Sequence, residues 1–214
     1  MQHFIVNIGR EFGALGLEIG KRLAGELGVK YYDRELVKVA AMNLHMTTGT
    51  GSLIDENPMQ PQHGLLSKLS VMETTKYNQF IQEQSQAIRR IAQRESCVFI
   101  GRCADFVLRD MEQNCLNVFI FAPYEARCDH IIEEYLAKEE YAHRGKTEDD
   151  YMAFAWEMHK LVTETDKKRH YYYKYVTGSN RGERHDKHIM LDSAAFGVEG
   201  TVEILKRCVM QRFG

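Results

Sequence analysis

Short apolar runs alternate along this chain with longer segments in which apolar residues recur at helical spacing. The runs are rich in β-forming residues, and two of them, residues 97–100 and 116–121, are compact in the way that is typical of parallel strands buried on both faces. The predicted strands are residues 4–8, 29–32, 97–100, 116–121 and 188–192. Between the first two strands, Ile19, Leu23 and Leu27 form one apolar stripe that stops at Gly28, which predicts an amphipathic helix.

The same periodicity predicts helices between the other strands. They fall at about residues 34–44, 65–95, 124–138, 150–165 and 198–211, and a glycine- and proline-bearing loop is expected at 47–64. Strands that alternate with helices imply an α/β fold, here one domain over residues 1–214 with three α/β/α layers and a mostly parallel five-stranded sheet. In such sheets ligands bind beyond the carboxyl ends of the strands, where Gly13, Asp33 and Arg102 are expected.

A glycine-spaced loop, residues 9–16 (Gly-Arg-Glu-Phe-Gly-Ala-Leu-Gly), joins the first strand to the first helix. Backbone N–H groups and the positive end of a helix dipole at such a turn suit a phosphate group. A standard P-loop would end in Gly-Lys-Ser/Thr, with the lysine on the outer phosphates and the hydroxyl on Mg²⁺. Here Gly16-Leu17-Glu18 occupies that place, and we expect Glu18 to point outward. The alternative is that the glycines serve only a tight turn and close helix packing.

The composition of the chain excludes several kinds of binding partner. The net charge of −2 argues against broad nonspecific binding to nucleic acid or to anionic membranes, and favours a small anionic ligand. No segment approaches the roughly 20 apolar residues of a membrane helix, and no basic, apolar leader is seen, so we expect a cytoplasmic protein. The five cysteines form no CxxC pair, so neither a disulfide framework nor a zinc site is indicated, and most are expected to be buried thiols. His185 and His188 lack further ligands, and no protein-held metal is expected.

Several landmarks occur in an order that resembles the nucleoside monophosphate kinases, most closely the cytidylate kinase-like family. They are the glycine loop, Leu-Gly-Val-Lys-Tyr-Tyr-Asp at 27–33, Ile-Gly-Arg at 100–102, Asp-Lys-Lys-Arg at 166–169 and Leu-Asp-Ser at 191–193. The resemblance implies a P-loop kinase core, a helical acceptor-side segment at residues 34–96 and a lid-like segment at 139–184. It also implies Mg-ATP-dependent phosphoryl transfer to a nucleoside monophosphate, with CMP or dCMP as the leading acceptor, and small nucleotides as the partners.

The resemblance also implies roles for individual residues. Arg10, Gly13, Ala14 and Gly16 are expected at the donor phosphates, and Asp33, Arg34 and Arg102 at the acceptor. Transfer between two anions requires alignment and charge neutralisation more than covalent chemistry. The residues expected to supply that neutralisation are Arg102, Arg127, Lys167 and Arg169. Arginine holds a phosphate with a planar fork, so Arg102 and Arg169 are favoured for geometry.

The chain departs from the cytidylate kinase pattern at several positions. Gly16 stands in place of the P-loop lysine, Leu15 in place of a small residue, Cys103 in place of an aspartate and Thr165 in place of an arginine. Arg10 is a candidate to replace the lysine charge. Two further hypotheses therefore stand beside kinase activity: a nucleotide-binding regulatory protein without transfer chemistry, and a kinase of another small substrate.

Each proposed ligand contact also has a purely structural alternative. Asp33 can cap the helix that follows it, because aspartate accepts the first N–H groups of a helix. Arg102 can form an ion pair at the sheet edge, and the charged run at 166–169 can be a solvated helix end. The sequence leaves these alternatives and the oligomeric state open.

Overall fold

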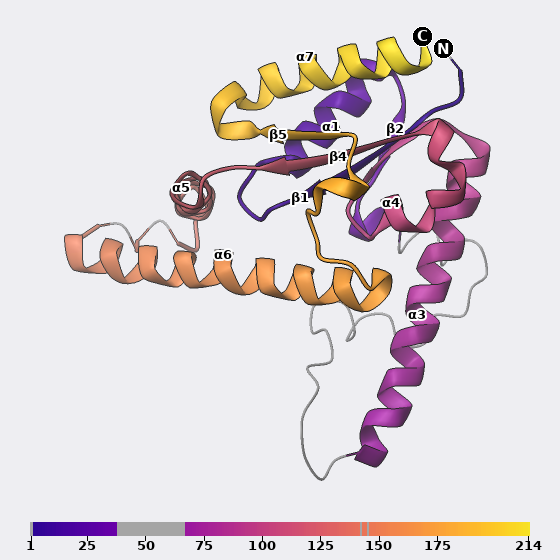
Figure 1. Cartoon of the computed structure of the whole chain (residues 1–214). Coiled ribbons are helices and arrows are strands. Elements are labelled where there is room, and N and C mark those ends of the chain that lie inside the picture. Colours follow the sequence, from indigo (N-terminus) through magenta and orange to yellow (C-terminus); the bar gives the residue numbers. More distant parts are fainter. Residues whose placement is uncertain (1, 38–66, 142, 145) are drawn as a thin grey trace.

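The computed structural model describes residues 2–37, 67–141, 143–144 and 146–214, with side chains in the helix over 67–94 described from residue 75 onward (Figure 1). A parallel sheet with the strand order β2-β3-β1-β4-β5 forms its centre. The strands are β1 (Ile5–Arg10), β2 (Lys30–Tyr32), β3 (Cys97–Ile100), β4 (Cys115–Phe121) and β5 (Ile189–Asp192). All five strands predicted from the sequence are present, and the expected α/β fold is confirmed.

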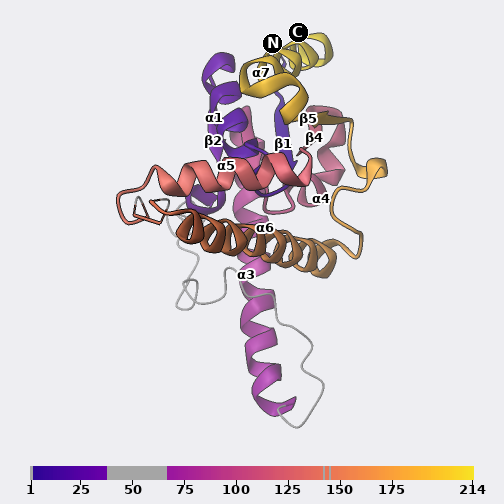
Figure 2. The same cartoon turned by 90° about the vertical axis from the view of Figure 1, so that its left-hand side faces the viewer.

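Helices cover both faces of the sheet. They are α1 (Gly16–Leu27), α3 (Ser67–Arg94), α4 (Ala104–Val107), α5 (Tyr124–Leu136), α6 (Glu148–Thr177) and α7 (Ser193–Phe213). Helices α1 and α7 pack together on one face, whereas α3 and α4 contact each other on the opposite face (Figure 1). Helices α5 and α6 lie side by side at the end of the sheet (Figure 2) and enclose a small apolar cluster of their own.

The side chains of β3 show how the three layers form. All four of its residues are buried, and they alternate in direction. Val98 and Ile100 belong to the apolar cluster beneath α1 and α7, and Cys97 and Phe99 belong to the cluster beneath α3 and α4. A strand without a polar face therefore lies in the middle of the sheet, as its composition predicted.

Helix α6 differs from the sequence prediction. A helix over 150–165 followed by a separate charged segment was expected, but one helix runs over Glu148–Thr177. The expected end near Thr165 is wrong because lysine, arginine and glutamate are good helix formers and no glycine or proline interrupts the chain before Gly178. Gly178 ends the helix in the left-handed conformation, with φ of 77°. The charged run 166–169 therefore lies on the same rigid rod as the residues before it.

Other expectations have different outcomes. The described part of the helix predicted at 65–95 is confirmed as α3, whereas most of the predicted helix at 34–44 and the loop at 47–64 lie outside the described residues. A 3₁₀ turn over Arg109–Asn114 was not anticipated. Four of the five cysteines are buried, as expected. No helix in the described ranges has the length and apolar character needed to cross a membrane.

Candidate functional site

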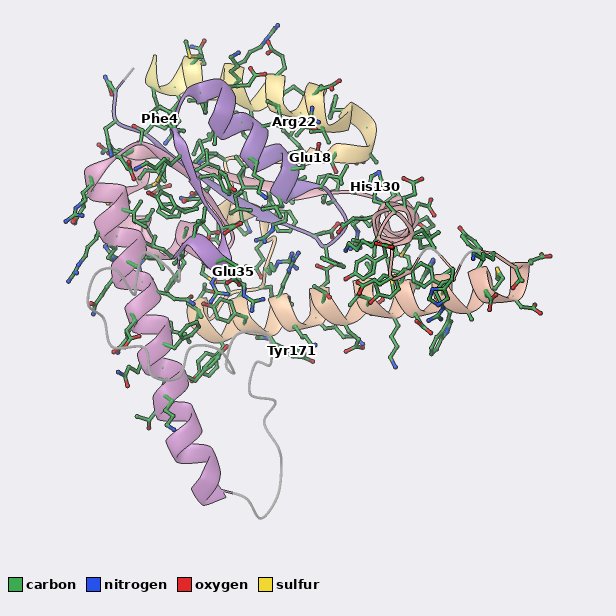
Figure 3. All side chains as sticks on the ribbon, turned by 180° about the vertical axis from the view of Figure 1, so that it is seen from behind. Phe4, Glu18, Arg22, Glu35, His130 and Tyr171 are labelled. Carbon is green, nitrogen blue, oxygen red and sulfur yellow. The ribbon has the colours of Figure 1, made fainter. Side chains whose placement is uncertain are left out.

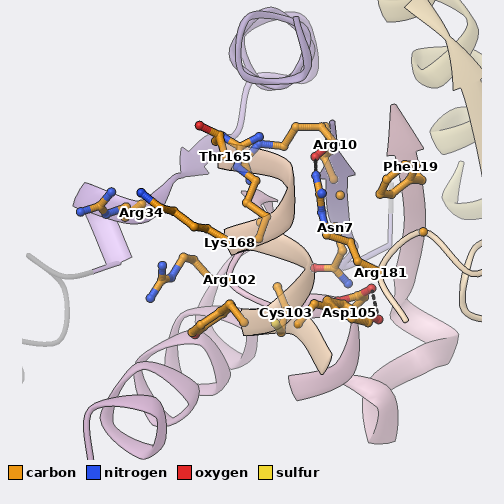
Figure 4. Close-up of a pocket in the computed structure, with 18 of the residues that line it drawn as sticks. Asn7, Arg10, Arg34, Arg102, Cys103, Asp105, Phe119, Thr165, Lys168 and Arg181 are labelled. Atoms are coloured by element: carbon orange, nitrogen blue, oxygen red, sulfur yellow. Dashed lines mark hydrogen bonds between the residues drawn. The ribbon is translucent and has the colours of Figure 1, made fainter. Parts of the chain in front are cut away.

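A cavity of about 200 Å³ lies at the carboxyl ends of β1 and β3 (Figure 4). Its floor comes from the last residues of β1 and from the turn 101–105 that follows β3. Its roof is the face of α6 that carries Leu161, Thr165 and Lys168, and one wall comes from the segment that follows α6. The cavity therefore occupies the edge at which ligands bind in open α/β sheets.

Cationic side chains dominate the walls of this cavity. Among the described lining residues, the cations are Arg10, Arg34, Arg102, Lys168, Arg169, Arg181 and Lys187, and the single acidic residue is Asp105. Asp105 is ion-paired with Lys187 and so offsets little of the remaining charge. A low-dielectric hollow with cations on several sides concentrates positive potential, which favours an anionic ligand with more than one charge.

Arg10 lies over two glycines. A Cβ atom on Gly16 would lie 2.5 Å from Cβ and 2.8 Å from Cγ of Arg10, and a Cβ atom on Gly101 would overlap Nη1 of Arg10. The side chain therefore leaves the end of β1, passes across the start of α1 and reaches the turn after β3. Gly16 is the residue expected in place of a P-loop lysine, and Arg10 fills the space that a side chain at Gly16 would occupy.

The surroundings of Arg10 are electrostatically unfavourable. Burial, followed by the nearby guanidinium groups of Arg169, Arg181 and Arg102, lowers the pKa of Arg10 well below its ordinary value, and Asp33 opposes this only weakly. An arginine nevertheless stays protonated in proteins. No ion pair or hydrogen bond reaches its guanidinium within the described part of the chain. A bound anion would relieve this cost.

Arg102 enters the cavity from a strained turn. Gly101, Arg102 and Cys103 all have positive φ, at 83°, 61° and 55°, which is uncommon for residues with a side chain. Nε of Arg102 donates to Oε1 of buried Gln84 on α3 at 3.0 Å. Its guanidinium also lies 4.8 Å from the ring centroid of Tyr172 on α6. Arg102 is thus oriented from two sides.

Cys103 lies in the same turn, and its thiol stays protonated and is therefore a poor nucleophile. Burial, followed by the charge of the neighbouring Asp105, raises the pKa of the Cys103 thiol to about 12. Only the thiolate is a good nucleophile. Cys103 therefore fills space beneath the cavity.

The glycine loop makes a tight turn beside the cavity. Gly13 has φ of 83°, and a Cβ there would lie 2.5 Å from the carbonyl oxygen of Arg127, so only glycine fits. Leu15 is the N-cap of α1 in the left-handed conformation, with φ of 56°, and its side chain has no polar atom to bind the first N–H groups of the helix. Ser193 donates to the carbonyl of Ala14 at 2.9 Å and fixes the loop against α7.

His130 and Glu18 are polar residues near the glycine loop, and each has a contact in the structure. Nδ1 of His130 lies 3.1 Å from the carbonyl oxygen of Gly13 (Figure 3). Glu18 is half-exposed and pairs with Arg22 at 2.8 Å on the outer surface of α1 (Figure 3). The predicted outward orientation of Glu18 is confirmed, so its carboxylate does not repel an anion in the loop.

Arg127 lies outside the cavity, beside the glycine loop. Nη1 donates to the carbonyl of Phe12 at 3.1 Å and to Asp166 of α6 at 2.5 Å, and Nε lies 3.2 Å from Glu11. Asp166 also accepts from the backbone N–H of Phe12 at 3.0 Å and from Arg181 at 3.1 Å. These contacts join the glycine loop to α6. Arg127 is therefore engaged in holding the loop, and its predicted contact with the transferred phosphoryl group stays a prediction.

A wider depression of about 800 Å³ adjoins the cavity. Several aromatic side chains line it, including Phe121, Tyr124 and Tyr171, together with Arg127 and Lys167. Lys167 pairs with Glu164 at 3.1 Å, and its side chain is 57% exposed. Phe119, Arg181 and Gly182 line both hollows. Arg181 consequently stands between them, and its Nη2 donates to the carbonyl oxygen of Arg10.

The structure thus brings together most of the residues predicted for the site. Arg10, Arg34, Arg102 and Arg169 line the cavity, and Gly13, Ala14 and Gly16 lie in the loop beside it. Oδ1 of Asp33 accepts from the N–H of Leu36 at 3.1 Å, so the predicted cap is present. Within the described ranges, no group of three or more His, Cys, Asp or Glu residues is arranged to hold a metal ion.

Sequence reasoning missed three charged lining residues, which are Asp105, Arg181 and Lys187. Arg181 carried a signal, because it lies in a glycine-bearing segment after a long helix. Asp105 and Lys187 carried none, since an isolated aspartate after a strand and a lysine before one are common surface residues.

Comparison with known proteins agrees with this geometry. A sequence model of the cytidylate kinase-like family matches residues 5–195. An uncharacterized protein from Eubacterium ventriosum ATCC 27560 has a similar solved structure, with a TM-score of 0.68, 19% identity, and coverage of 97% of this chain and 98% of that one. Shikimate kinase from Bacteroides thetaiotaomicron aligns with a TM-score of 0.50 and 14% identity over 97% of this chain and 98% of that one. At these identities the likeness concerns the fold, which is that of the P-loop kinases. No curated protein matches the chain.

Proposed function

The chain belongs to the cytidylate kinase-like family, and we propose from this that it transfers the γ-phosphoryl group of ATP to a nucleoside monophosphate, with CMP or dCMP as the leading acceptor. The observation that carries the proposal is the cavity at the carboxyl edge of the sheet, which has seven cationic residues and one paired acid among its described lining residues. Donor and acceptor phosphates together bring several negative charges to one place. Such a reaction requires this density of cations.

The reaction balances without a protein base. A nucleoside monophosphate is close to a dianion at neutral pH, because its second pKa is about 6. Its phosphate oxygen attacks the γ-phosphorus of ATP, a new P–O bond forms, and the bond between the γ-phosphorus and the bridging oxygen of ADP breaks. The electron pair of that bond leaves with ADP. The task of the protein is to align the two anions and to neutralise their charge.

Arg10 takes the role of the missing P-loop lysine in this proposal. Its side chain crosses Gly16 and brings a buried guanidinium to the cavity, where three other arginines act on it. Gly16 is then required, because any larger residue would displace Arg10. Arg102, held by Gln84 and by the ring of Tyr172, is placed to grip the acceptor phosphate. Arg169 and Arg34 line the same cavity and neutralise charge there.

The donor nucleotide fits the loop in part. The start of α1 lacks a side-chain cap from Leu15, and Gly13 keeps the loop tight, so backbone N–H groups at this end suit a phosphate. Leu17 and Glu18 supply no hydroxyl for Mg²⁺, so the ion would be held chiefly by the phosphates of ATP, as Mg²⁺ commonly is. It would supply charge neutralisation between the β- and γ-phosphates. We place the adenosine of ATP in the wider depression lined by Tyr124 and Phe121.

ADP release tests the proposal directly. Purified protein with Mg-ATP is assayed against CMP, dCMP, UMP and AMP, and the Arg102→Ala and Arg10→Met variants are assayed beside it. We expect acceptor-dependent ADP release that falls about 100-fold or more in either variant, since each removes a charged contact to a phosphate. Arg207→Ala is the matched control, because Arg207 is 79% exposed on α7 and pairs only with Glu203 among the described residues.

Two other functions are separated by the same assay. A nucleotide-binding regulatory protein is suggested by Gly16-Leu17-Glu18, which lacks the usual lysine and hydroxyl. It predicts saturable ATP binding without acceptor-dependent ADP release. A kinase of another small substrate is suggested by Cys103 in place of an aspartate, and it predicts ADP release with acceptors outside the nucleotide panel. Equal activity of the wild type and Arg102→Ala, with matched melting temperatures, would remove Arg102 from its role.

A further inference from the structure

Asp105 is the one acidic residue among the described residues that line the cavity. It follows the strained turn after β3 and lines the cavity, and its side chain is 13% exposed. The hydroxyl of Tyr173 donates to Oδ2 of Asp105 at 3.1 Å, and Nζ of Lys187 donates to the same oxygen. Both contacts go to Oδ2. Oδ1 has no partner among the described residues and is the oxygen left for a ligand.

The partners of Asp105 make it a fixed anion. The Lys187 side chain is 2% exposed, so its ammonium group depends on this carboxylate for charge balance. Burial, followed by the charge of Asp105, raises the pKa of Tyr173, which keeps the hydroxyl protonated as a donor. Lys187 and Tyr173 come from different segments and meet at one oxygen. This triad therefore holds Asp105 in a single orientation.

Asp105 lies at one end of the cavity, next to Arg181 but away from Arg34 and Lys168. The charges that act on Arg10 are those of Arg169, Arg181, Arg102 and Asp33. In Figure 4, Asp105 lies beside Cys103 and Arg181, on the opposite side of the cavity from Arg34 and Lys168. One end of the cavity thus suits phosphate, and the other offers a hydrogen-bond acceptor.

A carboxylate at this place needs a role other than phosphate binding or proton transfer. It would repel a phosphate, and the transfer proposed above requires no base because the acceptor is already ionised. An ionised carboxylate only accepts hydrogen bonds. It is therefore suited to an N–H group on the uncharged part of the acceptor.

We propose that Asp105 determines the specificity for the acceptor by accepting a hydrogen bond, at Oδ1, from the amino group of a pyrimidine base. This inference rests on the proposed function for the identity of the ligand as a nucleotide. An amino-bearing ring such as cytosine satisfies Oδ1, whereas uracil presents a carbonyl oxygen that the carboxylate repels. A site built around one hydrogen bond rejects the analogue that lacks it, because a buried polar group is then left unpaired.

The test asks whether Asp105→Asn changes the preference of the protein for CMP over UMP. Asp105→Asn keeps a carbonyl oxygen for Tyr173 and Lys187 and converts the oxygen that faces the ligand into an NH₂ donor. Dissociation constants for CMP and UMP are measured by calorimetry in the absence of ATP. We expect the wild type to prefer CMP by about 10-fold or more, and the variant to lose or reverse that preference. Asp110→Asn is the matched control, because Asp110 is an exposed aspartate that pairs with Arg89 and lies outside the cavity.

A second variant guards against loss of folding. Asp105→Asn leaves Lys187 buried without a counter-charge, so Asp105→Asn combined with Lys187→Gln removes both charges and is expected to show the same loss of preference. An unchanged ratio of the two dissociation constants in the folded variants overturns the inference, as does a wild type that binds neither nucleotide. Unchanged binding with turnover lost for both acceptors also overturns it, because that result assigns a proton-transfer role. If the preference between CMP and UMP reverses in the variant but the protein releases no ADP, Asp105 is supported as the residue that recognises the base, and the proposed phosphoryl transfer is overturned.

Discussion

Single glycines decide whether the guanidinium of Arg10 can reach the cavity. Gly16→Ala would place a Cβ 2.5 Å from Cβ of Arg10, whereas a Cβ on Gly25 in the same helix meets nothing within 4 Å. We expect Gly16→Ala to lower the free energy of unfolding by about 1–3 kcal/mol through overpacking. It should also weaken ATP binding about 10-fold or more. Gly25→Ala should raise the free energy of unfolding by about 0.4–1 kcal/mol, because it restricts the unfolded chain and favours helix.

Urea unfolding and ATP titration of the two variants measure these effects. Since both changes are glycine to alanine within α1, the comparison cancels the general effect of helix propensity. If Gly16→Ala bound ATP as tightly as Gly25→Ala does, Arg10 would not depend on the space at Gly16. The role of Arg10 as the substitute for the P-loop lysine would then lose its structural basis.

At the scale of elements, one carboxylate of α6 makes several polar contacts with the glycine loop and its neighbours. Asp166 accepts from the N–H of Phe12, from Arg127 and from Arg181, and it is about one fifth exposed. Asp166→Asn leaves two buried guanidinium groups short of negative charge. Because hydrogen bonds to charged groups contribute roughly 1.5–3 kcal/mol each, we expect the free energy of unfolding to fall by about 2–3 kcal/mol. Chemical denaturation measures this loss.

Glu164→Gln on the same helix is the comparison. Glu164 pairs with Lys167 at the surface, and both side chains are about half-exposed, so the expected change is within about 0.5 kcal/mol. The joint between α6 and the loop should also matter for the nucleotide. Asp166→Asn is expected to raise the KM for ATP more than the KM for the acceptor, because we propose that the loop binds the phosphates of the donor. If the two substitutions lowered the free energy of unfolding equally, Asp166 would not be the residue that holds α6 and the glycine loop together.

The whole molecule carries a net charge of −2, yet its cavity is strongly cationic. A multiply charged ligand should therefore stabilise the fold although the protein as a whole is acidic. We expect ATP without Mg²⁺ to raise the melting temperature, with a stabilisation of about 2.7 kcal/mol when ATP is at 100 times its dissociation constant. The effect should shrink between about 0.1 M and 1 M NaCl, since screening shortens the Debye length from about 10 Å to about 3 Å.

Differential scanning fluorimetry measures this shift, and uncharged adenosine at the same concentration is the control. Adenosine lacks the phosphates, so it should leave the melting temperature nearly unchanged. In Arg102→Ala the shift with ATP should be smaller than in the wild type, because one of the cavity cations is gone. A shift that is equally large at both salt concentrations would mean that phosphate charge does not dominate binding.

Much of the fold follows from local pattern. The five strands were predictable as short apolar runs rich in β-forming residues. The helix of Ile19, Leu23 and Leu27 was predictable because burial of one helix face imposes a period of 3.6 residues on the sequence. The tight turn at Gly13 was predictable because left-handed backbone favours glycine. The same local reasoning was wrong for α6, where a run of charges was interpreted as a boundary although those residues favour helix. Local composition reports solvent exposure there and carries no signal that the helix ends.

The sequence by itself determined the order of strands and helices along the chain, the loop between β1 and α1, and arginines that belong to recognisable motifs, such as Arg102. The tertiary structure alone decided which charges meet. Arg10 and Arg127 are the same residue type near the same loop, but one guanidinium faces the cavity and the other is held by Asp166. Asp105 and Lys187 became neighbours only when β5 joined β4 across the sheet. The reason is physical: the role of a charge depends on its distance to other charges, and strand order sets those distances.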